Sequence, residues 1–265
     1  MISGRTRVFA LLGRPVAHSL SPRMHNAAFA AMGLDAVYIA LDCGADSVPR
    51  LIHALAGAGG GGNVTVPHKA AAATAVGRMD GAPADACNTF WGDAGTAIGA
   101  NTDVDGVVGA MESLGVEGKS WLIVGTGGSA LAVAAAASRC GAAVAVQSRD
   151  DARRAEFLTR ARQLGAGTAE SSACDVVINA TPLGLDAKDP LPLSPELAPS
   201  ARYALDLVYA PGETSWVRAM RAAGALAADG REVLVRQGAA AFTRWFPGRT
   251  APVEVMRAAV RAGLA

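Results

Sequence analysis

The stretch SWLIVGTGGSALAVAAAASRCGAAVAVQSRD, residues 120–150, decides the fold of half of the chain. An apolar run at 121–124 is typical of a buried strand, and a glycine turn and an alanine-rich helix follow it. The turn matches GxGxxA at Gly125, Gly127 and Ala130. The first glycine permits a tight turn, the second lets backbone amides approach a pyrophosphate, and the small third residue lets helix and strand pack closely. In this context the pattern predicts a bound dinucleotide; the alternative is a glycine-rich turn that serves packing alone.

The residues after the second expected strand, 143–147, would choose between the two nicotinamide dinucleotides. An acidic side chain there hydrogen-bonds the ribose hydroxyls of NAD, whereas arginine pairs with the 2′-phosphate of NADP. A solvated charge cluster explains such residues nearly as well. The arginines favour NADP slightly, because the segment QSRDDARR contains both kinds of side chain, namely Arg149, Arg153 and Arg154 beside Asp150 and Asp151.

Strands and helices alternate along the rest of the chain. The pattern predicts a strand at 7–12 and a helix at 21–33, with Ser21 as N-cap, Pro22 at the first helical position and Gly33 after its end. A break is expected near GANTDVDGVVGAMESLG, after which a new series of strands and helices begins. The sequence therefore predicts an α/β fold with two domains and mainly parallel sheets covered on both faces. Further elements are expected as a strand at 36–42, a helix at 47–59 and a strand at 61–66.

The composition indicates a globular protein with a large core. The chain has 265 residues, of which 51% are hydrophobic and 18% are charged. Lys and Arg number 24 against 23 Asp and Glu, so no excess charge favours nucleic acid or an anionic membrane, and a small molecule is the expected partner. No segment resembles a signal peptide or a membrane span. The four cysteines lack CxxC spacing, so we expect buried, inert thiols in a reducing cytoplasm and no metal site. We also expect either a monomer or a homodimer.

Lys69 lies in the stretch GGGGNVTVPHKAAA, residues 60–73. A carbonyl that accepts hydride becomes an alkoxide, so a nicotinamide reaction needs a proton donor beside that carbon. A lysine can serve if a carboxylate orients it, and Asp103 in GANTD is the expected neighbour. Both residues follow short apolar runs, so we expect them at carboxyl ends of strands, where open α/β sheets bind ligands. Most lysines are surface charges, so the residue type alone leaves both interpretations open.

A series of motifs, together covering nearly the whole chain, resembles the shikimate dehydrogenases. The resemblance implies NADP-linked interconversion of 3-dehydroshikimate and shikimate in the biosynthesis of aromatic amino acids through chorismate. Two alternatives remain: an NAD-preferring paralogue that acts on quinate or an amino analogue, and a non-catalytic nucleotide-binding relative. The motifs, in order, are GRPVAHSLSPRMHN (13–26), NVTVPHK (63–69), CNT (87–89), GANTD (99–103), GTGGSA (125–130), NATPLG (179–184), DLVYAPGET (206–214) and QGAAAF (237–242).

The resemblance also implies roles for residues on the substrate side. Ser19 and Ser21 would donate hydroxyls to the substrate carboxylate, although helix capping is an alternative for Ser21. Lys69 and Asp103 correspond to the family's proton-transfer pair, and Tyr209 to a further contact near the carboxylate. Side chains that would hydrogen-bond the ring hydroxyls are Asn63, Thr65, Asn88, Asp103 and Gln237.

On the cofactor side, the resemblance implies a pyrophosphate loop and a second segment, 179–184, that closes over the adenosine and nicotinamide halves. Two departures matter: Ser148 stands where asparagine is usual, and Asp150 where threonine is usual. An acidic group beside a 2′-phosphate would repel it, so NAD use stays open. The residues implied to bind the cofactor are Gly125, Gly127, Gly128, Ser129, Ala130, Ser148, Arg149, Arg153, Asn179, Thr181, Leu207 and Gly230.

The expected architecture is a substrate-binding domain at 1–104, completed by 239–265, and a Rossmann-type dinucleotide-binding domain at 105–238, with catalysis in the cleft between them. The closing segment should pack on the first domain through Trp245, Phe246, Val253, Met256 and Val260. Three histidines inside motifs show no metal-ligand spacing, and each is expected to fix a loop by hydrogen bonding; they are His18, His25 and His68.

Overall fold

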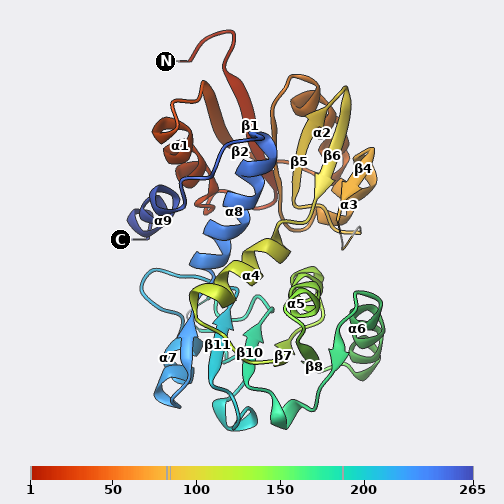
Figure 1. Cartoon of the computed structure of the whole chain (residues 1–265), viewed down its shortest axis with the longest axis vertical. Helices are drawn as coiled ribbons and strands as arrows, with labels where there is room; N and C mark the ends of the chain where they lie inside the picture. Colours follow the sequence, from red (N-terminus) through yellow and green to blue (C-terminus); the bar gives the residue numbers. More distant parts are fainter. Residues whose placement is uncertain (1, 82, 84, 187, 265) are drawn as a thin grey trace. The chain divides into compact units, whose positions relative to one another are not determined.

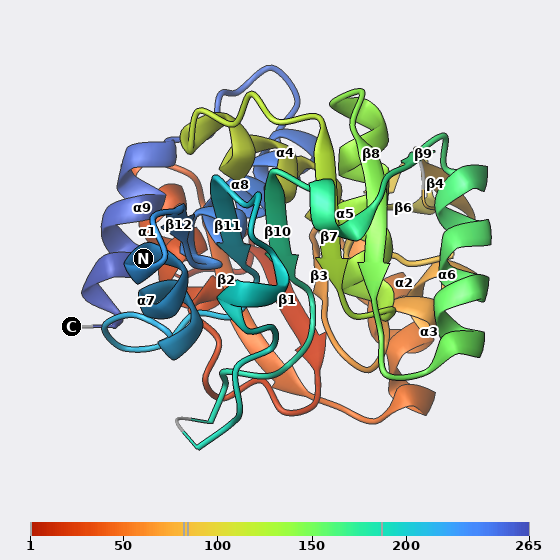
Figure 2. The same cartoon turned by 90° about the horizontal axis from the view of Figure 1, so that it is seen from below.

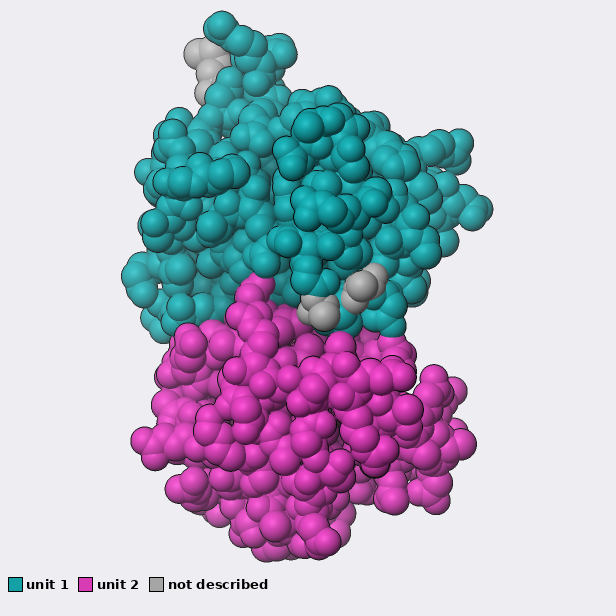
Figure 3. All heavy atoms as spheres, turned by 45° about the vertical axis from the view of Figure 1, so that its right-hand side comes forward, with its two compact units in different colours: residues 1–102, 235–263 teal, residues 103–234, 264–265 magenta. Residues whose placement is uncertain are grey.

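The chain divides into two compact units, which Figure 3 colours separately. Unit 1 consists of Met1–Thr102 and Val235–Gly263, and unit 2 of Asp103–Leu234 with Leu264–Ala265. The sequence places the domain boundaries after residues 104 and 238, whereas the second change of unit falls inside one continuous helix, Arg231–Trp245. A computed structural model describes residues 2–81, 83, 85–186 and 188–264.

Unit 1 is built on a mixed sheet that, over the described residues, has six strands in the order β2-β1-β3-β5-β6-β4 (Figure 1). The expected parallel pairing holds for β1 with β2 and β3, and for β4 with β6. Strand β5 runs antiparallel to both of its neighbours. The β5–β6 hairpin turns through Ala94 (φ 46°) and Gly95 (φ 81°), a left-handed pair typical of tight hairpins. The strands are β1 (Arg7–Gly13), β2 (Ala36–Asp42), β3 (Gly61–Val64), β4 (Arg78–Asp80), β5 (Thr89–Asp93) and β6 (Thr96–Ala100).

The helices of unit 1 correct one expectation. Ser21 is the first residue of α1 and Leu20 is its N-cap, so Ser21 does not cap the helix. Instead the Ser19 Oγ accepts the N–H of Ser21 at 3.2 Å, which satisfies one of the free amides of the first turn. Gly33 follows the helix with φ 61°, as expected of a glycine at a helix end. The helices are α1 (Ser21–Ala31), α2 (Val48–Gly57), α3 (Lys69–Ala75), α8 (Arg231–Trp245) and α9 (Val253–Ala262), with a short 3₁₀ turn at Ala45–Ser47.

The two faces of the unit 1 sheet are packed differently. Ala10 and Leu12 point to a face covered by α2 and α3 through small and aliphatic side chains. Phe9 points to the other face, where its ring lies 4.8 Å from that of Trp245 and 5.4 Å from that of Phe246. The expected packing of the closing segment on this domain is therefore confirmed. On α9, Met256 and Val260 are buried and Val253 is half-buried.

Unit 2 contains a sheet whose pairings among the described residues are all parallel. From one edge its order is β9-β8-β7-β10-β11-β12, which is the 3-2-1-4-5-6 order of a Rossmann fold (Figure 2). The chain changes direction across the sheet between β7 and β10, and ligands bind at such a switch point. The strands are β7 (Ser120–Val124), β8 (Ala143–Gln147), β9 (Gly167–Thr168), β10 (Val176–Asn179), β11 (Tyr203–Asp206) and β12 (Leu226–Ala228).

Alternate residues of the central strands fill two cores in unit 2. Trp121 and Ile123 of β7 pack with α4, α5 and α6 on one face. Leu122 and Val124 pack with Trp216 and its neighbours in α7 on the other. This alternation explains why β7 reads as a continuous apolar run. The helices are α4 (Asp103–Ser113), α5 (Gly128–Arg139), α6 (Asp151–Gln163) and α7 (Ser215–Ala222), with short 3₁₀ turns at Ser171–Ala173 and Pro195–Leu197.

All four cysteines have free thiols. Cys43, Cys87 and Cys174 are buried as expected, whereas Cys140 is only half-buried at the end of α5. Burial raises the pKa of Cys87 and of Cys174 to about 11. Over the part of the chain that the structure describes, we find no helix with the length and apolar character of a membrane span.

Candidate functional site

The glycine turn of unit 2 has the geometry that its sequence predicts. Gly125 has φ 111°, and a Cβ there would lie 3.0 Å from Thr181 Cγ2 and 3.1 Å from the Ala180 carbonyl oxygen. Only glycine fits this position without strain. A Cβ on Gly127 or Gly128 would instead meet no atom within 4 Å. The start of α5 is therefore uncrowded at these two glycines, and the N–H groups of a helix's first turn are donors that can bind phosphate.

The switch point brings a second predicted segment beside this turn. Asn179 is the last residue of β10 and pairs with Val124 of β7, directly before the turn. Its Oδ1 accepts the N–H and the hydroxyl of Thr181, at 3.0 and 2.7 Å. Its Nδ2 donates to the Leu183 carbonyl at 3.0 Å, so the amide shapes the segment 179–184 from within.

Leu207 and Gly230, both predicted on the cofactor side, lie against each other. The Leu207 N–H is bonded to the Asn179 carbonyl, which fixes it beside the end of β10. A Cβ on Gly230 would lie 2.3 Å from the Leu207 carbonyl oxygen, so only glycine allows this approach. The Gly230 N–H then donates to the Val208 carbonyl at 3.1 Å.

In the charged segment after β8, local contacts of Ser148 and Asp150 explain both departures from the family pattern. The Ser148 Oγ accepts the Asp150 N–H at 3.2 Å, a local turn that serine and asparagine can both make. Asp150 is the N-cap of α6, where its Oδ1 accepts the Arg153 N–H at 3.1 Å. Its Oδ2 lies 3.6 Å from the Arg153 Nε, and both side chains are exposed. The carboxylate is thus held by the positive end of a helix and by an arginine, while Arg149 is exposed beside it.

A hollow of about 250 Å³ lies between the glycine turn and α6. Arg153 and Arg160, seven residues and so about two turns apart on the helix, both line this space, which also borders the second glycine of the turn. The hollow therefore has two arginines and one glutamate beside the glycine turn, and Arg153 is one of the arginines that favour NADP. Its lining residues are Thr126, Gly127, Arg153, Glu156, Phe157 and Arg160.

In unit 1, Lys69 is the first residue of α3 and is half-buried. It comes shortly after β3, which ends at Val64, as its expected place beyond the carboxyl end of a strand requires. Its carbonyl accepts the N–H of Cys87 at 2.9 Å, which joins the motif NVTVPHK to the motif CNT. The charge of Lys69 opposes the effect of burial on the pKa of Cys87, so the ammonium lies within electrostatic reach of that thiol.

Unit 1 also contains a buried chain of neutral hydrogen bonds, which we name the amide–hydroxyl network; it consists of Tyr38, Asn63, Thr89, Thr102 and Asn88. The Tyr38 hydroxyl donates to Asn63 Oδ1 at 2.8 Å. Asn63 Nδ2 donates to the Asn88 carbonyl at 3.1 Å and to Thr89 Oγ1 at 2.9 Å. A carbonyl can only accept, so this contact fixes which end of the Asn63 amide is nitrogen. Any contact between Asn63 and a substrate would therefore use the second lone pair of Oδ1.

The same reasoning fixes the orientation of Asn88. Its Oδ1 accepts the backbone N–H of Thr102 at 2.7 Å and lies 3.1 Å from the Thr102 and Thr89 hydroxyls. A backbone N–H can only donate, so the atom facing Thr102 must be oxygen. Asn88 consequently presents Nδ2, a donor, on its other side. The two hydroxyls are 2.8 Å apart and complete the network.

Most of the remaining predicted residues lie at starts of helices or in loops of both units, and Gln237 lies within α8. Asp103 begins α4, directly after Thr102, and belongs to unit 2, whereas Lys69 belongs to unit 1. Thr65 is half-buried, and the absence of a side chain at Gly13 lets its methyl group approach, since a Cβ there would lie 2.3 Å from Thr65 Cγ2. In unit 1, Ser19 is half-buried and Ser21 and Gln237 are buried; in unit 2, Ser129 and Tyr209 are half-buried and Ala130 is buried.

Two of the three histidines test the expected hydrogen-bonding role, and one confirms it while the other corrects it. His68 is buried, and its Nε2 is 2.8 Å from the Cys43 carbonyl, so it fixes a loop as predicted. His25 is fully buried, but neither ring nitrogen has a hydrogen-bond partner among the described residues. Its ring stacks on that of Tyr38 at 4.6 Å and lies 4.9 Å from that of Trp245. Burial lowers the pKa of His25 to about 3, so the ring is neutral and serves packing.

Three members of the network were not singled out from the sequence. Tyr38 lies in β2 and carries no motif, so its sequence context indicates a core residue. Thr89 and Thr102 lie inside CNT and GANTD, but their partners come from segments far away in the chain. The sequence feature that could have indicated Thr89 and Thr102 is the run of small polar residues at strand ends, where buried polar side chains need hydrogen-bond partners.

Comparisons with known proteins agree with the motifs. Residues 11–90 match the model of the shikimate dehydrogenase substrate binding domain, and residues 230–261 match that of the shikimate 5′-dehydrogenase C-terminal domain. A protein of Anaeromyxobacter dehalogenans named shikimate dehydrogenase (NADP(+)) is 39% identical over 280 residues, covering 99% of this chain and 98% of the relative. The chain belongs to the shikimate dehydrogenase family.

Solved structures of shikimate dehydrogenases have the same fold. The enzyme of Thermus thermophilus, in complex with NADP(H) and shikimate, is 33% identical with a TM-score of 0.87 over 99% of this chain and 100% of that one. A shikimate dehydrogenase in complex with NADP+ is 30% identical with a TM-score of 0.91 over 100% of this chain and 98% of that one. The predicted two-domain α/β fold with a Rossmann-type domain is thereby confirmed.

Proposed function

We propose that this chain catalyses the reversible oxidation of shikimate to 3-dehydroshikimate with NADP. The observation that carries the proposal is the match, over nearly the whole chain, to a relative named shikimate dehydrogenase (NADP(+)). The solved relative with shikimate and NADP(H) supports the same substrate and cofactor. Unit 1 would bind the substrate and unit 2 the cofactor, since each unit carries the corresponding motifs.

The residues of unit 2 fit a dinucleotide. Gly127 and Gly128 leave space above the N-terminus of α5 for a pyrophosphate, and Asn179 shapes the neighbouring segment. When bound there, NADP supplies the carbon that accepts hydride. Arg149 and Arg153 would pair with its 2′-phosphate. The capping role of Asp150 supports this assignment, because its charge is already engaged by the helix and by Arg153.

On the substrate side, Lys69 would take the proton from the reacting hydroxyl and return it in the reverse direction. The neutral amine would accept that proton, and the resulting ammonium would donate it to the ketone oxygen in the reverse direction, with Asp103 orienting the group as in the family pattern. The buried Asn88 amide would donate from Nδ2 to a ring oxygen, because its Oδ1 is held by the Thr102 N–H. A site built from such polar groups rejects analogues that leave them unpaired.

The proposal is tested by absorbance at the reduced-nicotinamide band, with shikimate or quinate as substrate and NADP or NAD as cofactor. We expect the highest kcat/KM with shikimate and NADP. Preference for quinate and NAD would replace the proposal with the paralogue, the alternative that the acidic Asp150 leaves open in the sequence. No turnover in any mixture would indicate a non-catalytic relative.

Substitution of the lysine tests the proton-transfer role. Lys69→Ala should lower kcat by about 10²–10⁴-fold, the range of a lost general acid or base. Shikimate binding, measured by calorimetry, should persist. Lys188→Ala is the matched control, since Lys188 is exposed on a loop of unit 2. A rate for Lys69→Ala equal to that of the control would remove Lys69 from the mechanism.

A further inference from the structure

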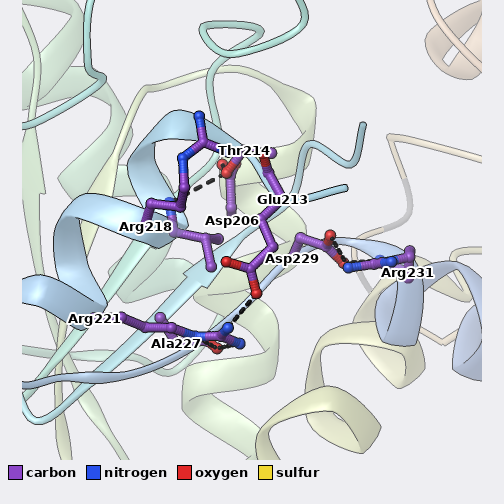
Figure 4. A network of polar contacts seen from close by, with 9 residues as sticks. Asp206, Glu213, Thr214, Arg218, Arg221, Ala227, Asp229 and Arg231 are labelled. Carbon is purple, nitrogen blue, oxygen red and sulfur yellow. Dashed lines mark hydrogen bonds and ion pairs between the residues drawn. The ribbon is translucent and has the colours of Figure 1, made fainter. Parts of the chain in front are cut away.

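Asp206, at the end of β11, is a fully buried carboxylate that the proposed mechanism does not use. Its Oδ1 accepts Asn179 Nδ2 at 2.8 Å and the Val208 N–H at 3.0 Å. Its Oδ2 accepts the Thr214 hydroxyl at 2.7 Å, a contact drawn in Figure 4. Three donors surround one carboxylate, and hydrogen bonds to an ionised acceptor are stronger than those between neutral groups.

The three donors come from two segments that carry predicted ligand contacts. Val208 and Thr214 lie near the two ends of 207–214, a segment without regular secondary structure that contains Tyr209. Asn179 begins 179–184 and also donates to Leu183 within it. One carboxylate therefore holds both ends of the segment with Tyr209 and the first residue of the segment beside the glycine turn.

Charged groups around Asp206 are themselves paired. Asp229 is bound to Arg231, with 2.8 Å between its Oδ2 and the Arg231 Nη2. Glu213 forms an ion pair with Arg221, whose guanidinium also donates to the Ala227 carbonyl, and Arg218 donates to the Glu213 carbonyl (Figure 4). Burial raises the pKa of Asp206, the charge of Asp229 raises it further, and the three donors oppose both effects. At such a site the acidic side chain is kept buried because of the hydrogen bonds that it accepts.

We propose that Asp206 is a positioning residue that holds Tyr209 and the segment 179–184 in the conformations that bind ligand. The inference rests on the proposed function only in that Tyr209 contacts the substrate. A purely structural role would stabilise unit 2 without affecting how much Tyr209 contributes to turnover. The two roles predict different results for the same set of variants.

Amide hydrogen exchange of the ligand-free full chain tests the holding role without any assay of activity. Asp206→Ala should speed exchange across 207–214 by about tenfold, because the Val208 N–H loses its acceptor. Asp206→Asn should exchange as the wild type does. Its Oδ1 can accept from Asn179 and Val208, and its Nδ2 can donate to Thr214 Oγ1, since a hydroxyl also accepts.

Two further variants keep this test decisive. Asp175→Ala is the matched control: Asp175 accepts Ser120 N–H and Oγ at 3.2 and 3.0 Å at the opposite, amino end of the same sheet, and its loss should leave 207–214 unchanged. Thr214→Val leaves the carboxylate in place but removes one donor to it, together with the Oγ1 that accepts the Val217 N–H at the start of α7. It replaces Asp206→Ala should that variant not fold, and its exchange is then read at Val208, outside the capped turn. Wild-type exchange in Asp206→Ala, or in its replacement, would overturn the proposal.

Kinetic coupling to Tyr209 separates positioning from general stability. Tyr209→Phe should lower kcat/KM for shikimate about tenfold in the wild type and in Asp206→Asn, as for one lost hydrogen bond. In Asp206→Ala the same change should have no further effect, because Tyr209 is already displaced. The proposal would be overturned if Tyr209→Phe lowered kcat/KM by the same factor in the wild type, in Asp206→Asn and in Asp206→Ala. Absence of shikimate-dependent NADP reduction by the wild type would instead remove the proposed function, and hydrogen exchange would still decide whether Asp206 holds the two segments.

Discussion

Each unit has a buried polar network near the carboxyl ends of its strands, and the two networks differ in charge. The amide–hydroxyl network of unit 1 contains only neutral groups, its contacts with a backbone carbonyl and a backbone N–H fix the orientations of the Asn63 and Asn88 amides, and it ends on the amide of Asn88. In unit 2 a single carboxylate, Asp206, gathers donors from separate segments. A neutral chain fixes which end of an amide faces a ligand, whereas a carboxylate brings segments together without restricting the direction of each donor.

A titrating group beside the first network and one within the second respond to pH in opposite ways. Burial lowers the pKa of His25, which stacks on Tyr38, and raises the pKa of Asp206. The unfolded chain therefore binds more protons at His25, and the contribution of His25 to stability is lost as the pH falls from 6.5 towards about 3. The folded chain binds more protons at Asp206. Its contribution is present at low pH and is lost as the pH rises through its raised pKa.

The largest expected effect comes from removing the buried imidazole. The full shift of the His25 pKa, from 6.5 to about 3, corresponds to at most about 5 kcal/mol of unfolding free energy, with about 2 kcal/mol lost by pH 5. His25→Phe keeps an aromatic ring against Tyr38 and cannot be protonated. We expect the variant to lose less stability than the wild type between pH 7 and pH 5, measured by urea unfolding.

The matched control for this experiment is His53→Gln, because His53 is exposed on α2. Its unfolding free energy should fall with pH in parallel with that of the wild type. If the unfolding free energy of His25→Phe also falls with pH in parallel with that of the wild type, His25 is not the group whose protonation lowers the stability. Protonation of unit 1 must then occur without opening the aromatic cluster around His25.

Local steric rules explain how much of the fold could be predicted. The glycine turn was placed correctly because each glycine has a reason that lies within a few residues, such as the left-handed φ of Gly125. The N-cap of α1 was assigned to Ser21, but Ser19 satisfies the amide of the first turn, and two serines so close together cannot be separated by sequence pattern. The antiparallel strand β5 was missed, since alternation of strands and helices says nothing of a hairpin inserted between them.

Site residues could be proposed from the sequence where a motif carries the chemistry and not where partners are distant. Lys69 and Asn88 came from motifs, whereas Tyr38 and Asp206 act through contacts that form only in the folded chain. His25 shows the reverse error: a histidine inside a motif suggested a hydrogen-bonding role, but the fold surrounds it with aromatic rings. Buried polar residues near strand ends are where tertiary partners matter most.

A smaller effect is expected from breaking the first bond of the neutral network. Burial raises the pKa of Tyr38, so its hydroxyl stays protonated and donates to Asn63. Tyr38→Phe leaves a buried amide oxygen without this donor and should lower the unfolding free energy by about 1–2 kcal/mol in urea titrations. The kcat and KM for shikimate should hardly change, because Asn63 Nδ2 keeps both of its acceptors. A large rise in the KM for shikimate would show that the bond from Tyr38 also orients the side chains further along the network.

The smallest expected effect comes from Thr102, beside the Asn88 amide at the end of the network away from Tyr38. Thr102→Val removes the hydroxyl near Asn88 Oδ1 but keeps the backbone N–H that fixes the amide. The KM for shikimate should rise about fivefold, equivalent to roughly 1 kcal/mol, with kcat nearly unchanged. In an Asn88→Ala background the same substitution should have no further effect, because the group it orients is gone. The exposed Thr74→Val on α3 is the control. Equal effects of Thr102→Val with and without the Asn88 amide would mean that Thr102 acts on the site by another route, for example through Asp103, the next residue in the chain.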